Sequence, residues 1–445
     1  MFGRNAPLPA GRLPFRCAAG VMLLLCVPSL AAAQNPAPQD PLAPGAVAPS
    51  PLRRPTPQSL NFGLFVIEGL DLVDATDGRP GLIADSRIRQ NTSFSALNAS
   101  LSYAKLGEEK SFTLATGADL RYFSIQPELL PSNVYGGASI STRVSRRVSF
   151  RGSINAGFSP FYSFGTFLLP SSMQDVRIPS PDQNIARMDT NTSGGSASLS
   201  WTLSSRSSIS AGYTLDYVTA PSDAYRVFTQ GINGGYQRRM TRYATLRLGY
   251  GYRRSSQYFQ DVPNFETHTL DTGVDYRRPI SSSRRTTVGF STGLSLLNEG
   301  GLRTFNVTGG ASLAYQMRRT WSTGVYYSRD TGKVGAVLTP FVYNTLSGNI
   351  SGLWTRRFGF AGGGGVSFGQ SAVLLENTYD AIYATARFHY DLSRHLPVYV
   401  EYVYYQYGFE QSSTLAPGFP MSMQRNGVRF GLGWSTPLIG QRVSQ

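Results

Sequence analysis

The sequence predicts an all-β protein, a transmembrane antiparallel up-and-down β-barrel of about 18 strands. From Asn61 onward, apolar and polar residues alternate in blocks of about 10 to 14 residues, the period at which successive side chains point to opposite faces of a strand. A tilted membrane strand needs about 9–11 residues, whereas strands of soluble proteins average about five or six. Short connections such as Ser145–Arg147 alternate with long ones such as Ser159–Thr190, as periplasmic turns alternate with external loops in such barrels.

Residues 1–33 precede this pattern and are expected to be a bacterial secretory signal peptide. Basic, apolar and small residues follow one another there as such peptides require: Arg4, Arg12 and Arg16, then Cys17–Leu30, then Ala31–Ala33. A retained anchor helix is the alternative, for which the apolar run is short. Both cysteines, Cys17 and Cys26, lie in this segment, so the mature chain is predicted to contain no disulfide.

Residues 34–60 are predicted to be a Pro-rich periplasmic linker. Eight prolines lie between Gln34 and Ser59, and proline fixes φ and lacks an N–H donor, so the stretch should be extended and solvated. A spacer is the preferred interpretation, and a docking site for a periplasmic partner is the alternative. The barrel is then expected over residues 61–436, with a C-terminal tail at 437–445.

The predicted strands number 18, an even number that leaves both chain ends on the periplasmic side. Their blocks are 61–74, 92–105, 110–124, 134–145, 147–158, 191–204, 206–219, 228–238, 242–254, 265–277, 285–298, 303–317, 320–331, 342–355, 358–370, 378–391, 396–410 and 425–435. The first block is the weakest, because Phe65 and Ile67 are apolar on one face while Leu64 and Val66 are apolar on the other. It is alternatively a plug inside the barrel, which leaves 16 strands as the second possibility.

The two faces of each block suit different solvents, and this assigns the predicted lining. In one block Phe150, Ile154 and Phe158 share a face, while Arg151 and Ser153 share the other. Charges on an inward face can stay in water in a tube of this size. The residues predicted to line the pore are Asp119, Arg121, Arg143, Arg151, Asp216, Arg247, Asp271, Asp275, Arg387, Glu401 and Arg429.

Arginine accounts for 38 of the 41 basic residues, since lysine occurs only at 105, 110 and 333, and many arginines mark the short turns. The preferred interpretation is a solvated ring that contacts phospholipid phosphates, because guanidinium binds phosphate bidentately. An anion-attracting periplasmic vestibule is the alternative. The basic turn residues are Arg146, Arg147, Arg238, Arg239, Arg318, Arg319, Arg356 and Arg357, with Arg277, Arg278, Arg284 and Arg285 at a further connection.

The final block carries a resemblance to a known family. Asn426–Leu432 has a polar residue, a glycine, two variable positions and then apolar residues two apart, and is similar to the assembly signal of porin-like outer-membrane β-barrels of Gram-negative bacteria. More loosely, the size and looping resemble the β-barrel porins associated with exopolysaccharide systems. The resemblance implies an outer-membrane location, with outer-membrane lipids and the assembly machinery as partners. Those barrels usually end on an aromatic residue, whereas here Trp434 is followed by a further segment ending at Gln445.

The expected function is that of a channel through which polar or anionic solutes diffuse passively. One alternative is a conduit for exopolysaccharide export, with a periplasmic export partner. A second is a structural or adhesive surface barrel with a closed lumen. The net charge of +15 also suits nucleic acid, but the predicted compartment does not. The connection Ser159–Thr190 is expected either to fold inward as a constriction or to form an external lid.

Neither a catalytic site nor a cofactor is expected. Gly289–Gly293 matches G-x-S-x-G but lies in an alternating strand, whereas a nucleophile elbow needs a strand-to-helix turn. With 3 His and 2 Cys the chain is poor in metal ligands. His268, His389 and His395 lie far apart in sequence. For Asp71, Asp74 and Asp77, hydrogen bonding within a turn is the preferred interpretation and a calcium site the alternative. For Gly362–Gly365, close strand packing is preferred to phosphate binding.

Overall fold

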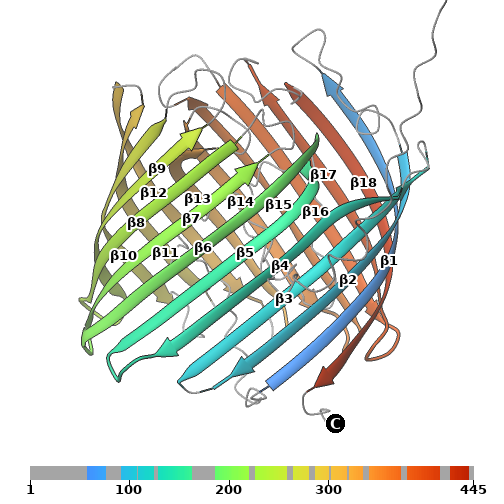
Figure 1. Ribbon diagram of the computed structural model, residues 1–445, viewed down its shortest axis with the longest axis horizontal. Coiled ribbons are helices and arrows are strands. Elements are labelled where there is room, and N and C mark those ends of the chain that lie inside the picture. The colour runs from blue at the N-terminus through green and yellow to red at the C-terminus, as the bar shows by residue number, and fades with distance from the viewer. Residues whose placement is uncertain are drawn as a thin grey trace, which may run out of the picture.

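A computed structural model describes residues 58–76, 92–107, 109–124, 129–162, 186–219, 226–257, 264–279, 286–299, 302–317, 320–333, 340–371, 378–410 and 421–439. These residues form 18 strands in a single sheet that closes into a barrel (Figure 1). The strands are β1 (Gln58–Thr76), β2 (Thr92–Leu106), β3 (Lys110–Phe123), β4 (Leu129–Arg143), β5 (Val148–Tyr162), β6 (Ala186–Ser204), β7 (Ser207–Thr219), β8 (Arg226–Arg239), β9 (Ala244–Gln257), β10 (Phe265–Pro279), β11 (Thr286–Glu299), β12 (Leu302–Gln316), β13 (Ser322–Lys333), β14 (Pro340–Leu353), β15 (Phe358–Ser371), β16 (Thr378–Asp391), β17 (Pro397–Phe409) and β18 (Ser422–Ile439).

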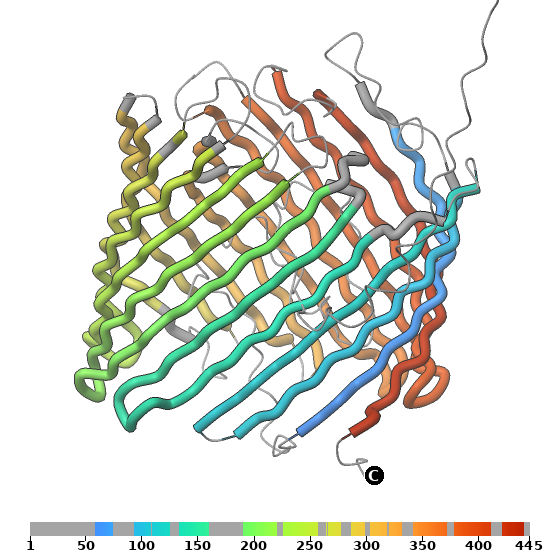
Figure 2. The backbone as a smooth tube through the Cα atoms, viewed as in Figure 1, coloured from blue at the N-terminus to red at the C-terminus, as the bar shows by residue number. Residues whose placement is uncertain are grey.

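Every strand pairs antiparallel with its neighbours in the chain, and β1 pairs with β18 to close the cylinder. Figure 2 shows the first and last strands side by side. The predicted 18-stranded up-and-down barrel is confirmed. The plug interpretation of the first block, and with it the count of 16, is wrong, because β1 is a wall strand between β18 and β2. The wall begins at Gln58 and ends at Ile439, whereas the sequence predicted 61 and 436.

The ambiguity of the first block has a physical cause. The inward side chains Phe65 and Ile67 of β1 belong to a buried apolar cluster inside the barrel, together with Phe94, Phe123 and Tyr399. The outward side chains Val66 and Leu70 are about half exposed on the exterior. Both faces of β1 are therefore apolar, so alternation alone could not assign them.

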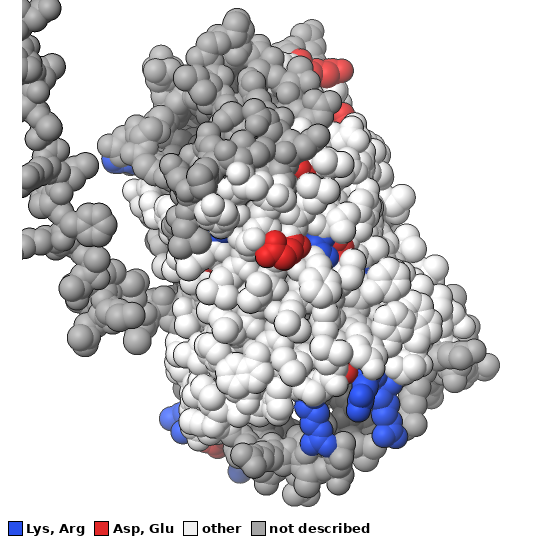
Figure 3. Space-filling model, turned by 90° about the vertical axis from the view of Figure 1, so that its right-hand side faces the viewer, with Lys and Arg blue, Asp and Glu red and all other residues white. Residues whose placement is uncertain are grey.

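The exterior carries the apolar half of the alternating pattern. Large side chains such as Trp201, Ile209 and Leu294 are exposed there. Ser291 and Ser295 point inward from the same strand as Leu294, and both are buried. In Figure 3 a wide, mostly uncharged band lies above Lys and Arg residues at the lower end of that face. An unpaired backbone group in lipid costs several kcal/mol, so a sheet with such a surface has to close on itself. No helix in the described residues has the length and hydropathy of a membrane span.

The turns at one end share a local design. In the β14–β15 turn, the Thr355 hydroxyl accepts hydrogen bonds from the amides of Arg357 (3.2 Å) and Phe358 (3.0 Å). This satisfies the N–H groups of a tight turn and leaves the arginine side chains exposed. β1 starts and β18 ends at this same end of the barrel, because Gln58 pairs with Lys105 and Leu60 with Ile439. Hydroxyls of Ser145, Ser204, Thr241 and Ser393 accept turn amides in the same way.

Candidate functional site

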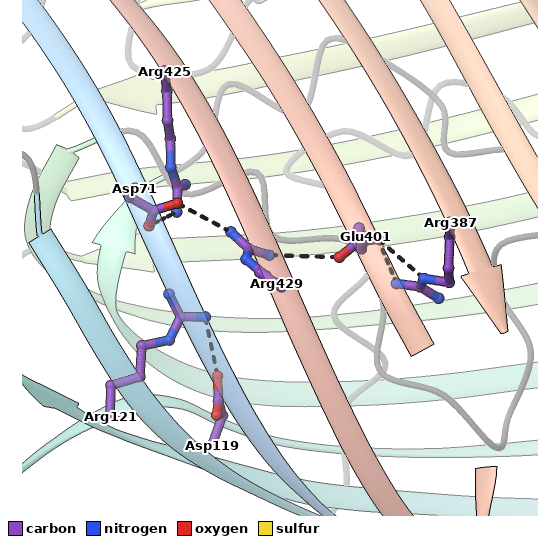
Figure 4. A network of polar contacts seen from close by, with 7 residues as sticks. All are labelled: Asp71, Asp119, Arg121, Arg387, Glu401, Arg425 and Arg429. Carbon is purple, nitrogen blue, oxygen red and sulfur yellow. Dashed lines mark hydrogen bonds and ion pairs between the residues drawn. The ribbon is translucent and has the colours of Figure 1, made fainter. Parts of the chain in front are cut away.

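A chain of ion pairs crosses the inner wall at the junction of the last strands with the first (Figure 4). Arg425 Nη2 lies 2.5 Å from Asp71 Oδ2, and Arg429 Nη2 lies 3.8 Å from Asp71 Oδ1. Arg429 Nη1 lies 3.8 Å from Glu401 Oε2, and Arg387 Nη2 lies 2.6 Å from Glu401 Oε1. Three guanidinium groups thus share two carboxylates, which leaves this ion-pair chain with one net positive charge.

Strand register builds this chain. Arg387 is directly opposite Glu401, and Glu401 is directly opposite Arg429, so β16, β17 and β18 present one row of alternating charge. Asp71 on β1 lies opposite Gly427, between the two arginines of β18. A Cβ at position 427 would lie 2.6 Å from Asp71 Oδ1. The glycine therefore gives the carboxylate the space it needs to reach both guanidinium groups.

Aromatic rings support the guanidinium groups. Arg387 lies 5.1 Å from the centroid of the Tyr399 ring, while Arg121 and Arg429 lie 4.9 and 5.7 Å from that of Phe94. Arg121 also pairs with Asp119 at 3.2 Å. Glu401 is 1% exposed and Arg387 2%. Such burial is tolerated because Glu401 faces two guanidinium groups, while Arg387 has both the carboxylate and the Tyr399 ring beside it.

A second charged group lies on β9 and β10. Arg247 Nε lies 2.7 Å from Asp271 Oδ2, and Arg247 Nη1 lies 3.2 Å from Asp275 Oδ1. Gly273 is directly opposite Arg247, so the guanidinium reaches the carboxylates on either side of a residue without a side chain. The register between β10 and β11 shifts between Leu270 and Tyr276. The two aspartates therefore lie on an irregular stretch of wall.

The remaining three predicted lining residues stand apart from both groups. Arg143, Arg151 and Asp216 lie on β4, β5 and β7. Arg151 is opposite Ser141 on one side and Ser198 on the other. Small neighbours leave its guanidinium uncovered, and Arg143 and Arg151 are both exposed. The side of the lumen formed by these strands is accessible to solvent, whereas the ion-pair chain is buried.

Two members of the buried chain, Asp71 and Arg425, were not predicted as lining residues. Interpreting Asp71 as turn chemistry is wrong, because β1 continues as a strand to Thr76 and holds Asp71 in the wall. Asp74 also lies in β1, and Asp77 lies outside the described residues. A signal was present for Arg425, since it is an even number of residues from Arg429 and therefore shares its face.

The predicted turn arginines that the structure describes lie in or next to short connections between strands. They are exposed, at the end of the barrel where β18 ends. Arg318, Arg319, Arg284 and Arg285 lie outside the described residues, as does the segment 163–185 of the long connection. The described turn arginines are Arg146, Arg147, Arg238, Arg239, Arg356 and Arg357.

The enzyme-like sequence signals fall on separate parts of the wall. Ser291 lies within strand β11. His268 Nδ1 lies 2.7 Å from the Tyr250 hydroxyl, and His395 Nδ1 lies 2.9 Å from the Ser435 carbonyl oxygen in a turn. Within the described part of the chain, no three His, Cys, Asp or Glu side chains converge as a metal site would need.

Three solved structures of Pseudomonas aeruginosa proteins have a similar shape. OpdQ is 11% identical, with a TM-score of 0.45, over 86% of this chain and 98% of that one. OccK7 (OpdD) is 10% identical, with a TM-score of 0.46, over 86% and 99%. OccK2 (OpdF), solved in complex with glucuronate, is 10% identical, with a TM-score of 0.44, over 86% and 98%. No family model matches the chain, and no curated protein matches it.

The chain folds as an 18-stranded transmembrane β-barrel. This conclusion rests on the closed 18-stranded sheet with its apolar exterior.

Proposed function

We propose that the protein is a passive outer-membrane channel for polar solutes, with a preference for anions and without a catalytic site. The observation that carries the proposal is the uncovered pair of inward arginines, Arg143 and Arg151, on the solvent-accessible side of the lumen. An anion that enters meets guanidinium groups held in water, while the ion-pair chain on β16, β17, β18 and β1 adds a net positive charge. Field lines focused in a narrow polar passage raise the local concentration of counter-ions.

In this proposal the two sides of the lumen have separate roles. The buried chain through Glu401 fixes strands β16, β17, β18 and β1 together, and the arginines of β4 and β5 contact the solute. Within the second group, Arg247 lies between two carboxylates, so these three residues carry one net negative charge. The exposed turn arginines are proposed to contact phosphates of lipids at the periplasmic interface.

Conductance measurements with a charge reversal test the channel. The purified protein is inserted into planar bilayers, and the reversal potential is measured across a KCl gradient. Arg151→Glu should move the reversal potential toward cation selectivity, because it replaces a luminal positive charge by a negative one. The matched control is Arg206→Glu, the same change in a solvent-exposed turn, which should leave selectivity near that of the unaltered protein.

Two results would count against the proposal. An unaltered protein that inserts without conductance would favour the barrel with a closed lumen. Equal shifts for the two variants would mean that charge outside the lumen sets the selectivity.

A further inference from the structure

The ladder between β12 and β13 stops before either strand ends. Its last pair is Gly309 with Arg329, although β12 starts at Leu302 and β13 runs on to Lys333. In the described part of the chain, Leu302–Thr308 therefore has no ladder partner on the β13 side. The flanking seams stay closed, since Leu302 pairs with Glu299 on β11 and Lys333 pairs with Pro340 on β14.

The outer face of this seam is apolar, with two exposed arginines, Arg303 and Arg329, on it. Phe305 and Val307 are 78% and 63% exposed, among the most exposed apolar side chains of the described residues. Arg329 is exposed beside them, and its Nε donates to the Val307 carbonyl oxygen at 3.1 Å. Its Nη1 lies 3.5 Å from Asn344 Oδ1, an oxygen that also accepts the Tyr327 hydroxyl. The guanidinium thus occupies part of the place of the missing strand partner.

The inner face of the same seam is polar and unsatisfied. Asn306 is opposite Ser295, and both point into the barrel because their neighbours in sequence are exposed outside. Ser295 is 2% exposed, and its Oγ has no hydrogen-bond partner. Asn306 Nδ2 and Thr304 Oγ1, from the strand segment that lacks a partner, are also buried without one. Buried polar atoms are normally paired, so three such atoms behind one gap indicate a place for a polar ligand group.

We propose that this seam is a lateral opening that binds a single-chain amphiphile with an anionic head group and passes it between the lumen and the outer leaflet. The chain would lie along Phe305 and Val307, and Arg329 would bind the head group as it enters. Ser295, Thr304 and Asn306 would receive the head group on the luminal side. The gap lies at the end of β13 away from the short turns, which faces outward if the proposed placement in the outer membrane holds.

Paired cysteines test whether the seam is open. Ala311 and Tyr327 are opposite each other in the closed part of the ladder, so Ala311→Cys with Tyr327→Cys should oxidise readily to a disulfide. Continued register would place Val307 opposite Thr331, but Val307→Cys with Thr331→Cys should oxidise slowly and be joined only by a longer bis-maleimide. Equally rapid oxidation of the two pairs would overturn the proposal.

A binding measurement tests the ligand. Dansyl-undecanoic acid is titrated into the detergent-solubilised protein, and its fluorescence is followed. Arg329→Gln should weaken binding by about tenfold or more, as expected for loss of a charged hydrogen bond. The matched control, Arg254→Gln, removes another exposed arginine, one opposite Gln230 and Glu266 in closed ladders, and should change binding less than about twofold.

Several results would overturn the ligand assignment. One such result is an equal loss of binding in the two variants, and another is equal binding of dodecyltrimethylammonium. A third is binding of lipid A without binding of the fatty acid, because the seam would then hold a resident lipid. Ion conductance of Arg329→Gln should match that of the unaltered protein, because Arg329 lies outside the lumen. A loss of conductance in every variant would concern the proposed channel and leave the fatty-acid result to decide the seam.

Discussion

Glu401 is the residue on which the buried charges of the inner wall depend. It is 1% exposed and serves two arginines, Arg387 at 2.6 Å and Arg429 at 3.8 Å. A carboxylate in this position does little for stability relative to an apolar side chain of the same shape. Removal of the carboxylate has a large cost, because Asp71 would then be the one carboxylate left in the ion-pair chain for three buried arginines. Two positive charges of the ion-pair chain would be left without a balancing negative charge in it.

We therefore expect Glu401→Gln to lower the free energy of unfolding by about 3–5 kcal/mol. The measurement is guanidinium-induced unfolding of the barrel in lipid vesicles. Adding Arg387→Met should recover part of the loss, because it removes one of the two positive charges that the ion-pair chain no longer balances. Asp271→Asn is the matched control, and it should cost about 0–1 kcal/mol because that carboxylate is partly exposed and Asp275 stays beside Arg247. A loss in the control as large as in Glu401→Gln would contradict this account.

Among the elements, the turns are decisive because each one fixes where one strand ends and the next strand starts. A hydroxyl before the arginine accepts two amide N–H groups, as Thr355 does for Arg357 and Phe358. The side chain of the arginine is exposed and available to lipid or solute. Serine and threonine at these positions are therefore structural, while the arginines beside them are available for electrostatics.

Thr355→Val should destabilise the barrel by about 0.5–1.5 kcal/mol, because the isosteric side chain accepts no hydrogen bond. Thr355→Ser keeps the hydroxyl and should stay close to the unaltered protein. Urea midpoints in the same vesicles compare the two. Equal midpoints for valine and serine would show that water replaces the hydroxyl without cost.

At the same scale, β1 shows the limit of reasoning from alternation. Strands with one apolar face, such as β5 with outward Ile154 and inward Arg151, are assigned correctly because lipid and water select opposite residues at successive positions. β1 packs Phe65 against Tyr399 inside and meets lipid outside, so its pattern lacks contrast. Partners across β1 and β18 depend on register between segments far apart in sequence, and for this reason the pairing of Asp71 with Arg425 was missed.

For the whole molecule, the number of strands and the closure of the sheet follow from the pattern of turns and loops. Eight of the predicted lining residues are gathered by the structure into three ion-paired groups, namely the buried chain, the Asp119–Arg121 pair and the group on β9 and β10. The local sequence determines which face of a strand a residue occupies, but not how far it lies from residues on other strands. The unpaired end of β12 likewise has no local signal, because Leu302–Thr308 alternates like any other strand.

Closure by β1 and β18 can be tested with one disulfide. Leu64 is directly opposite Trp434, and paired residues of antiparallel strands have Cβ atoms close enough for such a bond. Leu64→Cys with Trp434→Cys should yield a cross-linked peptide by mass spectrometry after oxidation and proteolysis. Leu64→Cys with Ile140→Cys, whose partner lies on β4, should yield none. A cross-link in the second protein, or none in the first, would refute the closed sheet.

The meeting of the first strand with the last also determines the order of folding. Every other ladder joins strands that follow one another in the chain, so those hairpins can form early, whereas the final seam waits for the end of the polypeptide. A slip of one residue there would turn Asp71 toward lipid and away from Arg425 and Arg429. The charges across this seam thus act as a check on register at the last step. A chain cut short before β18 keeps two open edges, the form in which sheets aggregate.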